Sequence, residues 1–218
     1  MFKYQLEPTP LPVYPVLGQN SVEQSNRIRK MMDDGGYNVR VLCSLYNNTP
    51  HVMVLSDFLS TDHHAYSNTV WIPGDSISVC AASKLADVTA VLKFTTYQLQ
   101  DPPATPELLR ARLQELFFVG GSGKPGLLLS GAKPLSEFFV RLEVPTAAWN
   151  AISAVEMHLD DPNRVVTDIK TSYALMEALD KFKLYSKTDG QQAWHNLRAE
   201  TRIEGGDSTT AFVKVYGK

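Results

Sequence analysis

Cysteine is scarce in this sequence of 218 residues. Its two cysteines, Cys43 and Cys80, each lie inside an apolar run that is typical of a strand. We therefore expect two buried free thiols and no disulfide framework. Free thiols are typical of a reducing compartment, so the sequence predicts an intracellular protein of the cytoplasm or the nucleus.

Long apolar runs are also missing. No stretch reaches the roughly 18 to 20 apolar residues that a helix needs to span a bilayer. The segment Met1–Leu17 contains one lysine, several prolines and no apolar run of the length found in signal peptides. We therefore expect neither secretion nor a membrane partner.

An excess of charge of either sign is missing too. Lysine and arginine together number 21, aspartate and glutamate number 23, and the formal net charge is -2. The net charge of the chain therefore does not favour nucleic-acid binding, and any basic surface would have to be a local patch. Apolar residues make up 44% and charged residues 20%, which is typical of a folded globular protein.

Common catalytic motifs do not occur. The sequence has neither Gly-x-Ser-x-Gly nor His-Glu-x-x-His. The stretch Gly120–Lys124 is similar to a phosphate-binding loop, but Pro125 follows the lysine where that loop needs serine or threonine. A flexible linker is the better interpretation. We predict no catalytic residue and no cofactor, with an enzyme lacking a recognisable motif as a third alternative.

One short segment concentrates residue types that can ligate a metal ion. Its four members lie between residues 57 and 64: Asp57, Asp62, His63 and His64. Adjacent histidines point in different directions, and no second pair of ligands follows at a regular spacing. The pattern favours a solvated loop, and we predict no metal site.

The order of predicted elements divides the chain into an arm and two larger units. Residues 1–19 contain four closely spaced prolines and should form an extended arm. Residues 20–100 predict a helix over 21–34 that ends at Gly35-Gly36. About five strands follow, over 37–46, 51–55, 66–72, 76–81 and 89–99.

The second unit, residues 105–218, predicts a mixture of helices and strands. A helix starts at Thr105, a flexible loop covers 120–126, and a long helix runs from Pro162 to about Tyr185. A hairpin over 194–203 and 209–216 ends the chain. The predicted fold class is α+β, with a helix-plus-hairpin C-terminal half. The sequence leaves open whether the two units share one core.

The first unit carries a family resemblance. Its residues are the helix through Ile28 and Met31 and three further segments, Val39–Leu42, Val52–Asp57 and Pro73–Val79. The segment Ser21–Leu99 resembles the N-terminal OB-fold domain of the large subunit of replication protein A. The resemblance implies a five-stranded barrel that binds single-stranded DNA or acidic peptides in a basic groove.

Candidate binding residues for such a groove are cations and aromatic rings. They are Arg27, Arg29, Lys30 and Arg40, with Tyr37, Tyr46 and Trp71 as stacking surfaces. Stacking on an aromatic ring contributes about 1 to 3 kcal/mol per base. The alternative is that the cations are a solvated helix face and the rings are core. We predict a non-enzymatic protein that binds single-stranded nucleic acid or acidic protein segments.

A second hypothesis is a self-assembling structural protein, such as a viral coat or another particle subunit. The proline-rich arm, the many short strands and the near-neutral charge favour it. Under this hypothesis the protein is a homo-oligomer located in a virion.

Overall fold

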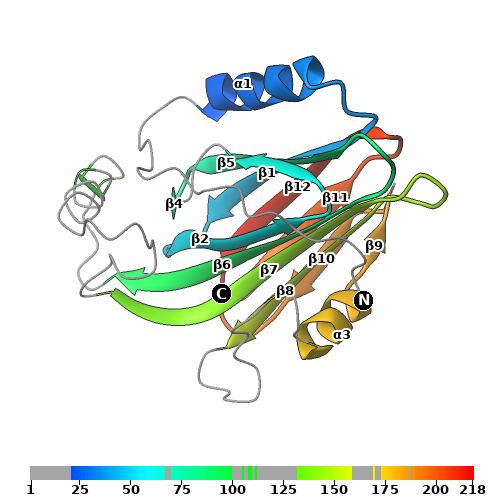
Figure 1. Ribbon diagram of the computed structural model, residues 1–218. Coiled ribbons are helices and arrows are strands. Elements are labelled where there is room, and N and C mark those ends of the chain that lie inside the picture. Colours follow the sequence, from blue (N-terminus) through cyan, green and yellow to red (C-terminus); the bar gives the residue numbers. More distant parts are fainter. Residues whose placement is uncertain are drawn as a thin grey trace.

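A computed structural model describes residues 21–66, 70–99, 105, 108, 109, 111, 132–158, 169, 173–186 and 188–218. In this part of the chain, two six-stranded sheets pack face to face, with one helix on the outside of each sheet (Figure 1). Within these residues, no helix is long and apolar enough to cross a membrane.

Sheet A has the strand order β10-β11-β12-β1-β5-β3. Strand β1 pairs in parallel with β12, and the other neighbours in this sheet are antiparallel. The bounds are β1 (Val39–Asn48), β3 (His63–Tyr66), β5 (Ser76–Ser83), β10 (Gly190–Ala193), β11 (Leu197–Ile203) and β12 (Ser208–Gly217).

Sheet B has the order β4-β2-β6-β7-β8-β9, and all its neighbouring strands are antiparallel. Its long strands β6 and β7 form the middle of the sheet. The bounds are β2 (Val52–Ser60), β4 (Val70–Trp71), β6 (Val88–Leu99), β7 (Ala132–Val144), β8 (Ala151–His158) and β9 (Leu184–Tyr185).

The core lies between the two sheets because side chains alternate along each strand. In β1, every second residue from Val39 to Leu45 is buried, while the residues between them are half-buried on the outer face. The large rings of Trp71, Phe94 and Phe138 fill the centre of this core. Both units predicted from the sequence contribute strands and core residues to it.

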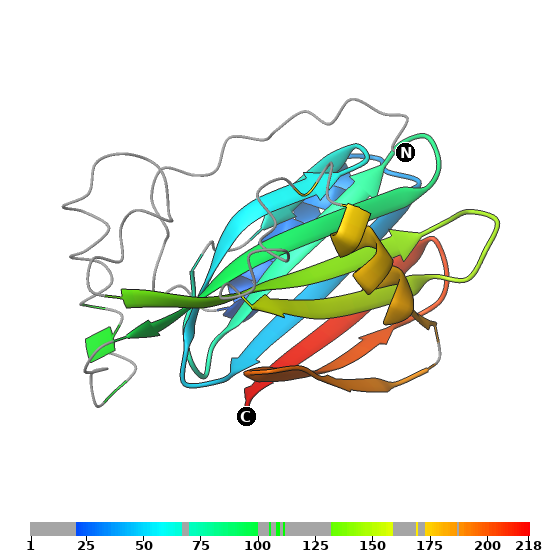
Figure 2. The same cartoon turned by 90° about the horizontal axis from the view of Figure 1, so that it is seen from below.

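Each helix covers part of one outer face. Helix α1 (Ser21–Asp34) packs Ile28 and Met32 against Cys80 and Ala82 of sheet A, and it ends before Gly36, whose φ is 65°. Helix α3 (Tyr173–Lys181) packs against the outer face of sheet B, as Figure 2 shows.

The predicted fold class was wrong. The protein is a β-sandwich, and within the described residues no five-stranded OB barrel closes over 20–100. Period-two alternation is common to both folds, so it could not separate them. The deciding contact is the pairing of β1 with β12, at the other end of the sequence.

Several local predictions can be compared with the elements. The helix over 21–34 and the C-terminal hairpin are confirmed, and both cysteines are buried free thiols. The long helix predicted to reach Tyr185 ends at Lys181, and Leu184–Tyr185 is a strand. The arm over 1–19 and the loop over 120–126 lie outside the described residues, as does most of the helix predicted from Thr105.

Candidate binding surface on sheet A

The structure separates the seven predicted groove residues. Arg27, Arg29 and Lys30 are exposed on α1, where Lys30 forms an ion pair with Asp34 at 3.3 Å. Arg40 lies at the start of β1, close to the C-terminal end of the helix. The four cations therefore lie on α1 and at the start of β1, on the outer side of sheet A.

The predicted stacking rings lie in three different places. Trp71 is fully buried, contacts Phe94 at a centroid distance of 5.2 Å, and donates its indole N–H to the Asp75 carbonyl at 3.1 Å. It is a core residue and offers no surface to a ligand. Tyr37 contacts His63, and Tyr46 lies on the outer face of β1.

A cavity of about 300 Å³ lies between α1 and sheet A. Arg29 and Arg40 line it together with hydroxyl-bearing residues of β12, and Arg27 and Lys30 lie outside this lining. The residues that provide its polar groups are Arg29, Asp33, Arg40, Ser208, Thr209 and Thr210. The sequence therefore predicted two residues of this cavity and missed the strand opposite them.

Arg40 is held in a fixed orientation at the cavity. Its Nε donates to Ser208 Oγ at 2.8 Å, its guanidinium forms an ion pair with Asp33, and its backbone N–H donates to the Asp207 carbonyl at 2.7 Å. A guanidinium has five N–H donors, so these contacts leave donors for a ligand. Arg29 has no ion pair to another described residue.

The apolar floor of the cavity includes the thiol of Cys80. Burial raises the pKa of this thiol to about 12, although Arg40 acts in the opposite direction. The thiol therefore stays protonated at neutral pH, and a protonated thiol is a poor nucleophile. The cavity offers groups for binding an anion and no activated cysteine.

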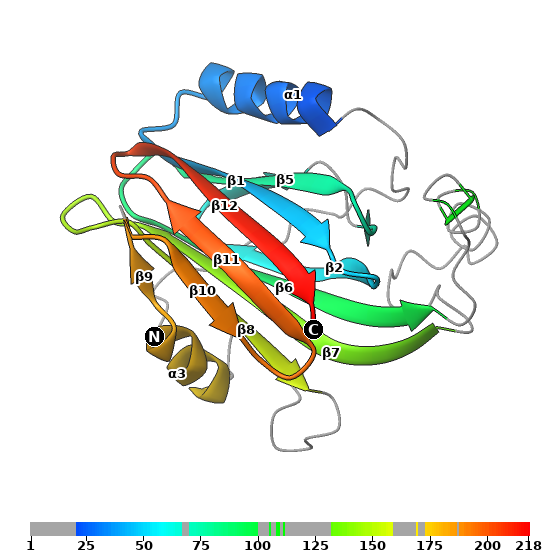
Figure 3. The same ribbon diagram turned by 180° about the vertical axis from the view of Figure 1, so that it is seen from behind.

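Beyond the cavity, cations and aromatic rings alternate on the outer surface of β11, β12 and the C-terminal part of β1; Figure 3 shows β11 and β12 extending away from α1. We call this surface the open face. Lys214 Nζ lies 4.9 Å from the ring centre of Tyr216 and 5.5 Å from that of Tyr46, and Arg198 Cζ lies 4.6 Å from that of Tyr216. Its members on these three strands are Tyr46, Arg198, Glu200, Arg202, Phe212, Lys214 and Tyr216.

Hydrogen bonds fix the centre of the open face. Tyr216 donates its hydroxyl to Glu200 Oε2 at 2.8 Å. A hydrogen bond with Tyr216 is the main cause of the raised pKa of Lys214, which keeps this amine charged. The alternation in 209–216 was visible in the sequence, but the strand lying beside it was not.

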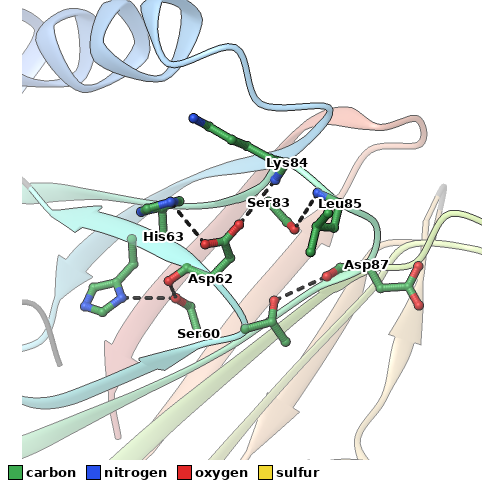
Figure 4. A network of polar contacts seen from close by, with 9 residues as sticks. Ser60, Asp62, His63, Ser83, Lys84, Leu85 and Asp87 are labelled. Carbon is green, nitrogen blue, oxygen red and sulfur yellow. Dashed lines mark hydrogen bonds and ion pairs between the residues drawn. The ribbon is translucent and has the colours of Figure 1, made fainter. Parts of the chain in front are cut away.

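The histidine-rich segment does not assemble a metal site. Strand β3 directs His63 towards Tyr37 and His64 towards Phe58, on opposite faces of the sheet. Asp62 forms an ion pair with His63 at 3.1 Å and accepts the Lys84 backbone N–H at 3.2 Å (Figure 4). In the part of the chain that the structure describes, no three histidine, cysteine or acidic residues gather as metal ligands.

Comparisons with known proteins find similarity in structure but not in sequence. No protein-family model matches the chain, and no curated protein sequence matches it. The lipid binding protein Nakanori is similar in structure, with a TM-score of 0.55 and 9% identity over 89% of this chain and 79% of that chain. Two structures of the Xerocomus chrysenteron lectin XCL are also similar, each at 8% identity over 81% of this chain. The mutated lectin has a TM-score of 0.41 and is covered to 97%, and the wild-type lectin has a TM-score of 0.39 and is covered to 99%. The likeness to Nakanori shows that the two proteins share a fold at very low sequence identity.

Proposed function

We propose that this protein is a non-enzymatic binding protein that holds the phosphate of a membrane-lipid headgroup in the cavity between α1 and sheet A. The observation that carries the proposal is the convergence of Arg29 and Arg40 around one cavity with Ser208 and Thr210, the two hydroxyl residues on the outer face of β12. Guanidinium groups match phosphate geometry with paired N–H donors, and hydroxyl groups can donate to the remaining oxygens.

The charges around the cavity favour an anion. Asp33 offsets part of the charge of Arg40 and orients it, while Arg29 supplies a second cation. Arg198 and Lys214 add positive charge on the neighbouring open face. A phosphate in the cavity would therefore meet two guanidinium groups at close range and further cations nearby.

Two observations favour a lipid headgroup over single-stranded nucleic acid. Two of the three rings on the open face, Tyr46 and Tyr216, already have cations over them, so a base could stack on Tyr216 only by displacing Lys214 or Arg198. Trp71, the largest ring in the predicted groove, is buried. The fold is also shared with a protein described as lipid binding.

The test is sedimentation of the protein with lipid vesicles. We expect it to bind vesicles of phosphatidylcholine mixed with phosphatidic acid more tightly than vesicles of phosphatidylcholine alone. Arg29→Gln should weaken this binding about tenfold or more, because a hydrogen bond to a charged group contributes about 1.5 to 3 kcal/mol. Arg27→Gln is the matched control, since Arg27 is exposed on the same helix and lies outside the cavity lining.

A second arm uses fluorescent oligo-dT at low and moderate salt. Binding to oligo-dT that weakens with salt and with Arg29→Gln, together with no preference for phosphatidic acid, would replace the lipid proposal by the nucleic-acid one. Equal vesicle binding by Arg29→Gln and the unchanged protein would rule out the cavity as the headgroup site.

A further inference from the structure

One end of the sandwich presents three large apolar side chains to solvent. Leu85, in the turn between β5 and β6, is 85% exposed. Trp149, in the turn between β7 and β8, is 63% exposed, and Tyr185 in β9 is 52% exposed. Figure 1 shows these turns and β9 together at the right-hand end of the molecule. We call Leu85, Trp149 and Tyr185 the tip residues.

Hydrogen bonds tie the turns that carry the tip residues to one another. Asp87 Oδ1 accepts the backbone N–H of Thr146 at 2.7 Å and its hydroxyl at 2.8 Å, which joins the β5–β6 turn to the β7–β8 turn. The backbone N–H of Ser186 donates to the Asn150 carbonyl at 2.8 Å, which adds the segment after β9. The segments that carry the tip residues are therefore joined by hydrogen bonds, and we call the residues that make these bonds, Asp87, Thr146, Asn150 and Ser186, the base of the tips.

The same base reaches the headgroup cavity. Asn150 donates its side-chain N–H groups to the carbonyls of Glu204 and Gly206 at 2.8 and 2.9 Å. The next residue of that turn, Asp207, accepts the backbone N–H of Arg40. The tip residues and the cavity are thus connected through one short turn.

The turn that carries Leu85 is itself held rigidly. Leu85 donates its backbone N–H to Ser83 Oγ at 3.2 Å, and Lys84 donates its own to Asp62 Oδ2 (Figure 4). Asn38 also donates its side-chain N–H to the Lys84 carbonyl at 2.6 Å. This rigid turn gives Leu85 no burial, and the exposure of Leu85 is informative because Trp149 and Tyr185 are exposed at the same end of the sandwich.

We propose that the tip residues enter the interfacial layer of a lipid bilayer and thereby bring the cavity to the headgroups. This inference rests on the proposed function and deepens it by naming the surface that meets the membrane. Tryptophan and tyrosine combine an apolar ring with a polar group and favour the membrane interface. Leucine favours the hydrocarbon below it.

Charge and shape point to lipid as the occupant. Lys84 directly precedes Leu85, and Lys183 Nζ, which is ion-paired with Glu143, lies 5.7 Å from the ring centre of Tyr185. Lysines beside apolar tips can attract anionic headgroups while their aliphatic stems extend along the apolar layer. Leu85 and Trp149 belong to two separate turns and Tyr185 belongs to β9, so the tips do not form one continuous segment, which suits a soft bilayer better than a complementary protein surface.

The experiment measures the tryptophan fluorescence of the full chain with the vesicles described above. We expect a blue shift on binding, and quenching when the lipids carry bromine in their acyl chains. Both signals should disappear in Trp149→Phe, because the other two tryptophans pack on core rings: Trp71 is fully buried, and Trp194 is half-buried against Phe138 and Phe182. Leu85→Ser should weaken vesicle binding about tenfold, as the loss of one leucine from an apolar phase predicts.

Tyr173→Ser is the matched control, because Tyr173 is 84% exposed at the start of α3 and is not a tip residue. If Leu85→Ser weakens binding and Arg29→Gln does not, the docking surface stands and the cavity assignment fails. If Arg29→Gln weakens binding while Leu85→Ser and Tyr173→Ser have equal effects, or if bromine does not quench Trp149, the docking surface is overturned and the cavity assignment survives.

Discussion

Two tryptophans show how differently the sandwich interior and its loop end use the same residue type. Trp71 is fully buried between the sheets and packs on Phe94, whereas Trp149 is largely exposed in a turn. In the interior, aromatic rings pack against one another. At the loop end, other aromatic rings are exposed to solvent on turns that are held by hydrogen bonds. An aromatic residue in this protein therefore points to a binding surface where its ring is largely exposed, and to a core role where its ring is buried.

The largest expected effect separates these two tryptophans directly. Trp71→Ala should lower the free energy of unfolding by about 3 to 5 kcal/mol, because it leaves a cavity in the core. Trp149→Ala should change it by no more than about 0.5 kcal/mol, since the ring is mostly in water. Denaturant unfolding measures both values.

The comparison would break if the two variants were equally destabilised. A large loss of stability in Trp149→Ala would mean that this ring has a structural role, and its exposure would then be no sign of a docking surface.

A smaller effect is expected from the base of the loop end. Asn150 is 3% exposed and bonds two carbonyls of the β11–β12 turn, so Asn150→Ala should cost about 1 to 3 kcal/mol of unfolding free energy. Asn38→Ala removes one exposed hydrogen bond and should cost less than Asn150→Ala. Thermal unfolding of the two variants checks this order, and the reverse order would argue against the Asn150 link as the main tie.

The smallest expected effect depends on pH. Hydrogen bonds from Thr146, its backbone N–H first, lower the pKa of Asp87 below its ordinary value of about 3.9. The folded state therefore favours the carboxylate, and this contribution is complete above the ordinary value and is lost as the pH falls through the lowered pKa. We expect Trp149 fluorescence to change in that acidic range without vesicles.

Asp87→Asn provides the control for this titration, because it keeps an acceptor oxygen for Thr146 and has no proton to gain. The acidic step in Trp149 fluorescence should be absent from this variant. A step of the same size in both proteins would assign the change to another group and would remove Asp87 as the link between the two turns.

The parts of the fold that the sequence predicted correctly are those with local signals. The helix over 21–34 has a glycine stop, and the C-terminal hairpin has a turn between two alternating strands. The sandwich itself depends on the parallel pairing of β1 with β12, which joins distant segments and leaves no local pattern. The resemblance of 21–99 to an OB-fold domain rested on alternation that a sandwich also produces.

The candidate site was predictable to a similar extent. Arg29 and Arg40 were predicted, with Arg27 and Lys30, as the cations of a basic OB-like groove, and the structure brings these two to one cavity. Trp71 was predicted to be a stacking surface but is buried, because the sequence position of a ring does not show whether the ring faces the core or the solvent. Leu85 and Trp149 were missed because each is a single apolar residue in a turn, and only the folded arrangement gathers them at one end. The self-assembly hypothesis stays a prediction.

Binding to lipid vesicles is the most direct test of the whole account. The purified protein is sedimented with phosphatidylcholine vesicles, with and without phosphatidic acid, at moderate salt. The account predicts that the protein pellets with the vesicles containing phosphatidic acid, and that far less of it pellets with phosphatidylcholine alone. Protein that stays in the supernatant with both kinds of vesicle would contradict the account.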